Sequence, residues 1–383
     1  MRFKMKYLVT DLYSDFSCIG GTCSNTCCQN WSIVIDEETM EKYRQLDEPV
    51  RSMILNKIVE TECGYEIVKE ENGRCPFLTE KNLCQLYLQV SPDILSETCK
   101  TFPRKAAAYG NTIMATVSLA CPEVVRMVLE RKEPIQFVFA EQGEERVSMG
   151  TEGAYYNALL QGLVVTTQLL QNRQFSMWQR LQLVVTLSME LQTAFSASDF
   201  EKIYSISEQY KDVHYCKEVL QQQNISEVVP DGCLNLIISI FNLLENGQGL
   251  ERKSQELLKN IHVFSQEDEQ KYRMWSEDFA KQEQDVEWEH LAVQLTFEYY
   301  MDVLKGNSIT VNVVKMLIFL IIARVLEVIE FQKNKRLILE QKRDLIAQVS
   351  RMLEHSKALE LVATYIVDGN STEQLFQLLY CLK

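Results

Sequence analysis

The feature that most constrains this chain is a dense group of cysteines near its start. The stretch CIGGTCSNTCCQNW, residues 18–31, contains Cys18, Cys23, Cys27 and Cys28. Four more follow in short motifs before residue 122: Cys75, Cys84, Cys99 and Cys121. Thiolates are soft ligands that select zinc, copper(I) or iron–sulfur clusters, and four of them complete a tetrahedral zinc site or hold a cluster. The sequence therefore predicts that these eight cysteines supply metal ligands, at two sites or at one site with bystanders.

Disulfides are the rival interpretation of the same residues. The first residues, MRFKMKYLVTDLYSDF, lack the apolar segment of a secretory signal, so we expect a cytoplasmic protein with reduced thiols. Spacing does not separate zinc from iron–sulfur. Cys23 and Cys27 form a close pair of the kind that zinc sites use, whereas the other gaps are long and irregular, which a cluster tolerates. The four cysteines outside these motifs are expected to pack as small hydrophobic side chains: Cys63, Cys216, Cys233 and Cys381.

Turn-forming residues are concentrated in the first part of the chain. Six of the seven prolines precede residue 135, and apolar residues at helical spacing dominate after residue 153. In the first part, WSIVID suits a half-buried strand, Asp36 can cap a following helix, and Asn72-Gly73 is typical of a hairpin turn. We therefore predict a mainly α protein. A small irregular α+β cysteine-rich metal-binding module, residues 1–140, would precede a large helical domain, residues 150–383.

Charge and hydropathy narrow the range of partners. The formal net charge is −14, which argues against nucleic acid as a partner because phosphate contacts need clustered Lys and Arg. The most apolar segment, residues 311–331, is interrupted by Asn312, Lys315 and Arg324. Its uninterrupted run is too short to span a bilayer, so we expect a buried helix and no membrane partner.

Three motifs together resemble a known family. FSCIGGTCSNTCCQNWSIVID, CPFLTEKNLCQLY and LSETCKTFPR resemble the flagellin lysine-N-methylase (FliB) family and, more loosely, the YkgJ-type zinc- or iron-chelating cysteine domain. The motifs cover residues 16 to about 122 and are specific as a set. The stretch 289–326 is also similar to the helical part of that family, with less distinctive residues.

The resemblance implies an enzyme, a protein-lysine N-methyltransferase. It would move a methyl group from S-adenosylmethionine to lysine side chains of flagellin. It also implies an iron–sulfur cluster, of the 4Fe-4S type, on the N-terminal cysteines, with zinc as the alternative. The sequence shows neither the Gly-rich loop of a doubly wound methyltransferase nor the Cys-x3-Cys-x2-Cys of radical enzymes, because Asn30 stands where the third cysteine would be. The S-adenosylmethionine site is therefore not located by sequence.

Direct methylation of lysine needs a neutral amine, although the ordinary pKa of lysine is about 10.4. Burial or a nearby proton acceptor can supply it. The polar stretch EWEHLAVQLTFEYY, residues 287–300, offers candidates for this role, of which we single out Glu289, His290 and Tyr300. The rival function is a non-catalytic zinc- or iron-binding protein that delivers metal or binds a partner through its helical region.

Overall fold

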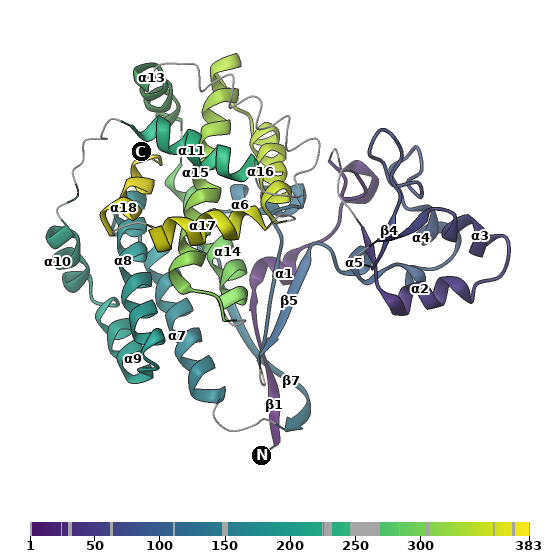
Figure 1. Cartoon of the computed structure of the whole chain (residues 1–383), viewed down its shortest axis with the longest axis horizontal. Coiled ribbons are helices and arrows are strands. Elements are labelled where there is room, and N and C mark those ends of the chain that lie inside the picture. Colours follow the sequence, from purple (N-terminus) through teal and green to yellow (C-terminus); the bar gives the residue numbers. More distant parts are fainter. Residues whose placement is uncertain are drawn as a thin grey trace.

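The computed structural model describes residues 2–23, 25–29, 33–61, 64–109, 112–147, 152–223, 225, 232–245, 269–282, 284–303, 306–354, 357–369 and 372–382. Two parts are visible in Figure 1: a large helical body and a smaller module that projects from it. The predicted fold class is confirmed, because a small α+β region with strands precedes a large helical domain. Trp31 and Cys63 lie outside the described residues.

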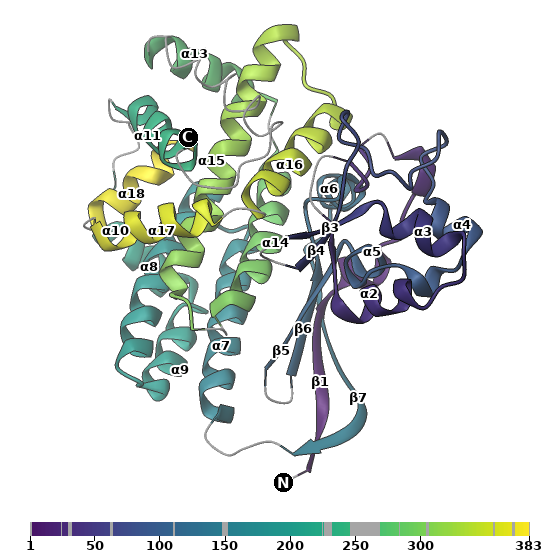
Figure 2. The ribbon, with the colours of Figure 1, turned by 45° about the vertical axis from the view of Figure 1, so that its right-hand side comes forward.

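The body contains a four-stranded sheet whose order is β5-β6-β1-β7. β1 runs parallel to β6 and antiparallel to β7, and β5 pairs antiparallel with β6. Figure 2 shows this sheet between the module and the helices. The strands are β1 (Arg2–Thr10), β5 (Arg104–Tyr109), β6 (Thr112–Val117) and β7 (Phe137–Val147).

The helices of the body bury one continuous hydrophobic core that extends from Leu8 on β1 to Cys381 near the end of the chain. The helices are α1 (Asp11–Asp15), α6 (Pro122–Glu130), α7 (Glu152–Leu170), α8 (Met177–Ser196), α9 (Phe200–Gln209), α10 (Val213–Gln223), α11 (Cys233–Glu245), α13 (Glu269–Ala280), α14 (Asp285–Val303), α15 (Ile309–Asn334), α16 (Leu339–Glu354), α17 (Ala358–Gly369) and α18 (Thr372–Tyr380).

Helix α15 occupies the centre of this core. Its segment Ile309–Lys333 is long and apolar enough to cross a membrane by length and composition, but the most apolar part is fully buried inside the protein. It packs against α8, α14, α16 and α17. The predicted buried helix over 311–331 is confirmed.

The module has its own small core, built between Ile33 and Ile94 around Tyr43, Ile54 and Phe77. Its three-stranded sheet has the order β2-β4-β3. Its elements are η1 (Gly20–Thr22), β2 (Val34–Ile35), α2 (Glu37–Arg44), α3 (Val50–Leu55), β3 (Ile58–Thr61), β4 (Gly64–Ile67), α4 (Gln85–Gln89), η2 (Pro92–Ile94) and α5 (Glu97–Thr101).

The predicted hairpin around Asn72-Gly73 is wrong in part. The turn exists, because the Gly73 amide donates to the Glu70 carbonyl at 2.8 Å and Gly73 has a φ of 79°. However, β4 pairs with the preceding β3 and with β2. After the turn, the Arg74 guanidinium donates to the Asn82 side chain and to the Thr79 carbonyl, and these hydrogen bonds hold the segment in place of a second strand.

The body sheet takes strands from both sides of the module in the chain, since β1 precedes the module and β5, β6 and β7 follow it. These four strands belong to the body, and the module is an insertion between α1 and β5. Whether the predicted boundary separates folding units stays a prediction.

Asp36 caps α2 as predicted and also joins two elements of the module. Its carboxylate accepts from the Thr39 amide at 2.8 Å and from the Glu97 amide at the start of α5 at 3.0 Å. Burial alone would raise the pKa of this carboxyl, but these hydrogen bonds hold it at about 2.

We therefore expect Asp36→Ala to destabilise the module by about 1 kcal/mol or more, as loss of a helix cap does, and Asp36→Asn to retain most of the stability because asparagine is also a good cap. Since the folded pKa is depressed, this contribution is present above about pH 4, the unfolded pKa, and is lost as the pH falls toward about 2. Chemical denaturation of the three proteins at pH 7 and pH 3 measures both effects. Equal stability of Asp36→Ala and the unsubstituted protein at pH 7 would contradict the assignment.

Candidate metal centre and an adjoining acidic cavity

The described motif cysteines fall into two groups. The first, which we call the inner group, combines Cys28 with Cys75, Cys84 and Cys99. The Cys75 amide donates to the Cys28 carbonyl at 2.8 Å, and Cys84 bridges to Leu78, three residues beyond Cys75. Cys99 lies on α5, where its amide donates to the Ser96 cap at 3.2 Å.

Charge also links the members of the inner group. Burial raises the pKa of the Cys75 thiol to about 11, and the charges of Cys28 and Cys84 add to this effect. The pKa of Cys99 is likewise raised, first by loss of hydration and then by Cys28, Cys75 and Cys84. Each thiolate therefore makes the next one harder to form unless a cation neutralises the group.

Lys69 is a cation whose charge acts on two members of the inner group. Its Nζ atom is buried and has no hydrogen-bond partner within the described part of the chain. Its positive charge lowers the pKa of both Cys28 and Cys75. A buried ammonium without a partner is costly, so an anionic group at the four thiols would satisfy it.

The second group, the outer group, consists of Cys18, Cys23, Cys27 and Cys121 around Arg351 of α16. The Arg351 guanidinium donates to the Asn25 side chain at 2.7 Å and to the Ala120 carbonyl at 2.8 Å. It therefore fixes the segment after Cys23 against the residue before Cys121. Burial lowers the pKa of Arg351, while charges on Cys27, Cys121 and Cys23 oppose this effect.

The adjacent pair Cys27 and Cys28 joins the two groups. A hydrogen bond from the Cys27 thiol is the main reason why the pKa of Cys28 falls to about 6, with further help from Thr26, Lys69 and Arg74. The same contact raises the pKa of Cys27. Cys28 is thus the thiol that ionises most readily in the pair, and a thiolate is the form that binds metal.

These observations fit a thiolate-bound metal by their donor chemistry. No disulfide joins the cysteines that the structure describes. Within those residues, no three His, Cys, Asp or Glu side chains lie close enough together to hold a metal ion. The support therefore comes from the grouping of thiols around Lys69 and Arg351. Cys216, Cys233 and Cys381 are buried in the body, as expected for small hydrophobic side chains.

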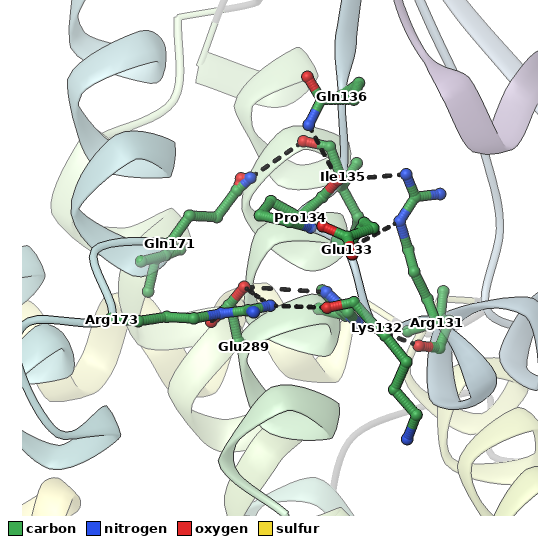
Figure 3. Close-up of polar contacts among 12 residues, drawn as sticks. Arg131, Lys132, Glu133, Pro134, Ile135, Gln136, Gln171, Arg173 and Glu289 are labelled. Atoms are coloured by element: carbon green, nitrogen blue, oxygen red, sulfur yellow. Dashed lines mark hydrogen bonds and ion pairs between the residues drawn. The ribbon is translucent and has the colours of Figure 1, made fainter.

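The predicted catalytic residues Glu289, His290 and Tyr300 all lie on α14 and are fully buried. Glu289 accepts from Arg173 at 2.9 Å and from Arg180 at 2.7 Å. Figure 3 shows how Arg173 also holds the loop 131–136 through the Lys132 carbonyl, at 3.0 Å. Glu289 therefore connects α14, the start of α8 and the chain that enters β7.

His290 and Tyr300 have similarly closed surroundings. The His290 Nδ1 atom lies 3.3 Å from the Val128 carbonyl, and burial lowers the pKa of the ring. Tyr300 packs against Gly162 of α7, where an added Cβ would lie 2.7 Å from the tyrosine hydroxyl. None of the three lines the large cavity that the structure describes around Lys105. Their catalytic role stays a prediction.

That cavity lies where the module meets the body. It has a volume of about 640 Å³, in the range of small-molecule sites. The module contributes Glu97 and Thr101 from α5, the helix that carries Cys99. Its other lining residues are Tyr13, Arg104, Lys105, Ala106, Ala107, Glu298, Tyr299, Met301, Asp302, Lys315, Leu353, Glu354, Leu359 and Glu360.

Lys105 of β5 is held between two buried carboxylates of this cavity. Its Nζ atom lies 2.5 Å from Glu298 Oε1 on α14 and also contacts Glu354 on α16. The Ser118 hydroxyl donates to both oxygens of Glu354, at 2.8 and 2.9 Å, and Ser350 donates to it as well. Ser118 lies three residues before Cys121, so its hydrogen bonds place Glu354 next to the chain segment that carries this member of the outer group.

The two carboxylates differ in their electrostatics. Burial is the main effect on both, but Lys105 and the serine hydroxyls outweigh it at Glu354, whose pKa is lowered. At Glu298 burial, followed by the charge of Glu354, prevails and raises the pKa to about 7. Glu298 lies in the polar stretch 287–300, from which the catalytic candidates were predicted. Lys105 and Glu354 are 249 residues apart, so no local sequence pattern connects them.

Two models of known protein families match this chain. The model of the FliB lysine N-methylase C-terminal domain matches residues 164–381, more than half of the chain. The chain belongs to the FliB lysine N-methylase family. This confirms the predicted resemblance and the predicted class of enzyme, a protein-lysine methyltransferase. A second model, described as a candidate zinc- or iron-chelating domain, matches residues 17–122, the region of both cysteine groups.

Individual relatives agree with the family. A lysine-N-methylase of Salmonella choleraesuis is 26% identical over 315 residues, which cover 70% of this chain and 77% of that protein. A lysine-N-methylase of Salmonella typhimurium is 25% identical over the same lengths. The flagellar biosynthetic protein FliU of Salmonella muenchen is 35% identical over 120 residues, 30% of this chain and 71% of FliU. No solved structure matches the chain.

The environment of Glu289 yields a test of its structural role. Glu289→Ala leaves Arg180, which is 3% exposed, without its carboxylate, and breaking a buried ion pair in this way costs about 3 kcal/mol or more. We expect a large fall in the thermal unfolding midpoint. Glu287→Ala on the same helix removes a less buried pair, with Lys342, and should cause a smaller fall. Equal midpoints for the two variants would contradict a structural role for Glu289.

Proposed function

We propose that this protein transfers methyl groups from S-adenosylmethionine to lysine ε-amines of flagellin, in the cytoplasm, and that its module holds an iron–sulfur cluster of the 4Fe-4S type. One observation carries the proposal. The regions that match the metal-chelating domain and the FliB C-terminal domain meet at one acidic cavity, to which both contribute side chains. The names of the relatives, which include a flagellar biosynthetic protein, support flagellin as the substrate.

The inner group is the better candidate for the cluster. The charge of Lys69, whose buried Nζ atom has no hydrogen-bond partner in the described part of the chain, acts on Cys28 and Cys75 and would balance part of the negative charge of a thiolate-bound cluster. When bound, the cluster would supply an anionic centre that fixes α5, since Cys99 lies on that helix. The chain itself would then position Glu97 and Thr101 at the cavity.

The activity is tested with anaerobically purified protein, labelled S-adenosylmethionine and flagellin. We expect label on lysine side chains of flagellin, and none on flagellin whose lysines have been blocked by reductive dimethylation. Absence of label, with the metal shown to be bound, would contradict the methyltransferase proposal and favour a non-catalytic metal-binding protein.

The ligand assignment is tested by replacing single cysteines. Cys75→Ser and Cys99→Ser should lose the bound metal, because each removes one of four thiolates of the inner group. Cys121→Ser of the outer group and Cys381→Ser of the body should retain the absorption of that site. Iron, zinc and sulfide analysis with visible spectra measures the outcome, and distinguishes iron–sulfur from zinc.

Equal metal content in all four variants would show that the inner group is not the site. Complete loss in Cys121→Ser as well would show that both groups share one metal centre, since Cys381→Ser controls for the loss of a buried thiol.

A further inference from the structure

The contacts of the acidic cavity suggest how an acceptor amine is handled, given the proposed function. We propose that the cavity between β5, α14 and α16 receives the ε-amine of the acceptor lysine and that Glu298 takes the proton from it. The established family relationship assigns no residue to this step.

The cavity is built to hold an alkylammonium group. Two carboxylates, 6% and 8% exposed, already converge on the Nζ atom of Lys105. Buried carboxylates are uncommon without such a partner. The wall also offers apolar surface for a lysine stem, from Ala106, Met301 and Leu359.

The two carboxylates are suited to different tasks. Glu354 is fixed by Ser118, Ser350 and Lys105, so it remains a charged acceptor that can orient an ammonium group. Glu298 has Lys105 as its hydrogen-bond partner in the described part of the chain. Its pKa of about 7 suits a group that accepts a proton near neutral pH and later releases it to water.

Positive charges in the same wall favour the neutral form of an incoming amine. Lys105 and Lys315 both line the cavity, and the Lys315 Nζ atom lies 3.0 Å from Asp302 and 4.6 Å from the centre of the Tyr299 ring. A neighbouring cation lowers the pKa of an amine, so the acceptor would lose its proton to Glu298 more readily here than in water.

The methyl transfer itself balances without a redox partner. The acceptor enters as an ammonium group and gives one proton to the Glu298 carboxylate. The nitrogen lone pair then forms the new N–C bond, and the electrons of the breaking C–S bond return to sulfur, which leaves as a neutral thioether. The methylated nitrogen carries the positive charge, which faces Glu354, and Glu298 returns its proton to water.

The test uses the metal-loaded full chain, flagellin and labelled S-adenosylmethionine, with Glu298→Gln and the matched control Glu287→Gln. Glu287 is also an acid on α14 in an ion pair with a lysine, but it lies outside the cavity. For the unsubstituted protein we expect kcat to rise as the pH passes through about 7. Glu298→Gln should lower kcat about 100-fold and abolish this rise, as loss of a proton acceptor does. Glu287→Gln should change neither.

Several charged or titratable groups share the cavity with Glu298 and shape this pH profile: Glu97, Arg104, Lys105, Tyr299, Asp302, Lys315, Glu354 and Glu360. Calorimetric binding of S-adenosylmethionine separates the acceptor site from the donor site, since both ligands carry a cation. Unchanged donor affinity in Glu298→Gln supports the acceptor assignment. A loss of donor affinity, or a kcat and pH profile like those of the unsubstituted protein, would overturn it.

If the unsubstituted protein methylates no flagellin, the proposed function fails but the cavity is still tested. Nα-acetyl-lysine methylamide then serves as the probe, with the norleucine analogue as its uncharged control. Binding of the lysine probe that weakens at least tenfold in Glu298→Gln would support the site. No binding to the unsubstituted protein would reject it.

Discussion

The arrangement of the site depends on two ion pairs, in which the Lys105 ammonium lies between Glu298 and Glu354. They join β5, the strand that follows the module, to two helices of the body. Removing either carboxylate from water would cost several kcal/mol without a cation nearby. Lys105 therefore allows Glu298 and Glu354 to lie in the same buried wall. Because Lys105 is on β5, this arrangement depends on the position of that strand.

The module is tied to this wall from two sides. Cys99 and the cavity residues Glu97 and Thr101 share the short helix α5. On the other side, Arg351 binds Asn25 and the Ala120 carbonyl beside the outer cysteine group, and Glu354 lies on the next turn of the same helix α16. Each cysteine group is therefore joined to the acidic wall by a helix, α5 for the inner group and α16 for the outer group.

Local sequence patterns predicted local structure well. The Asp36 cap, the buried segment 311–331 and the division into a cysteine-rich α+β part and a helical part all depend on neighbouring residues. The pairing of strands did not follow from such patterns, since β4 joined β3 rather than the segment after Asn72-Gly73. The grouping of cysteines and the Lys105 contacts join residues far apart in the chain. Glu289 illustrates the same limit, because its partners Arg173, in the loop before α8, and Arg180, on α8, are more than 100 residues away in the chain.

The connection between module and body has a further consequence. The module is inserted between α1 and β5, and Arg104 closes its neck by donating to the Phe16 carbonyl at 3.0 Å and stacking over the Phe16 ring at 5.2 Å. Insertions whose two ends are held together at the surface of a domain are readily exchanged in evolution. A longer, shorter or differently liganded module could replace residues 17–103 while the order of strands in the body sheet stays the same. Because the two ends of the module meet at Phe16 and Arg104, the metal-binding module and the helical body can change independently of each other in evolution.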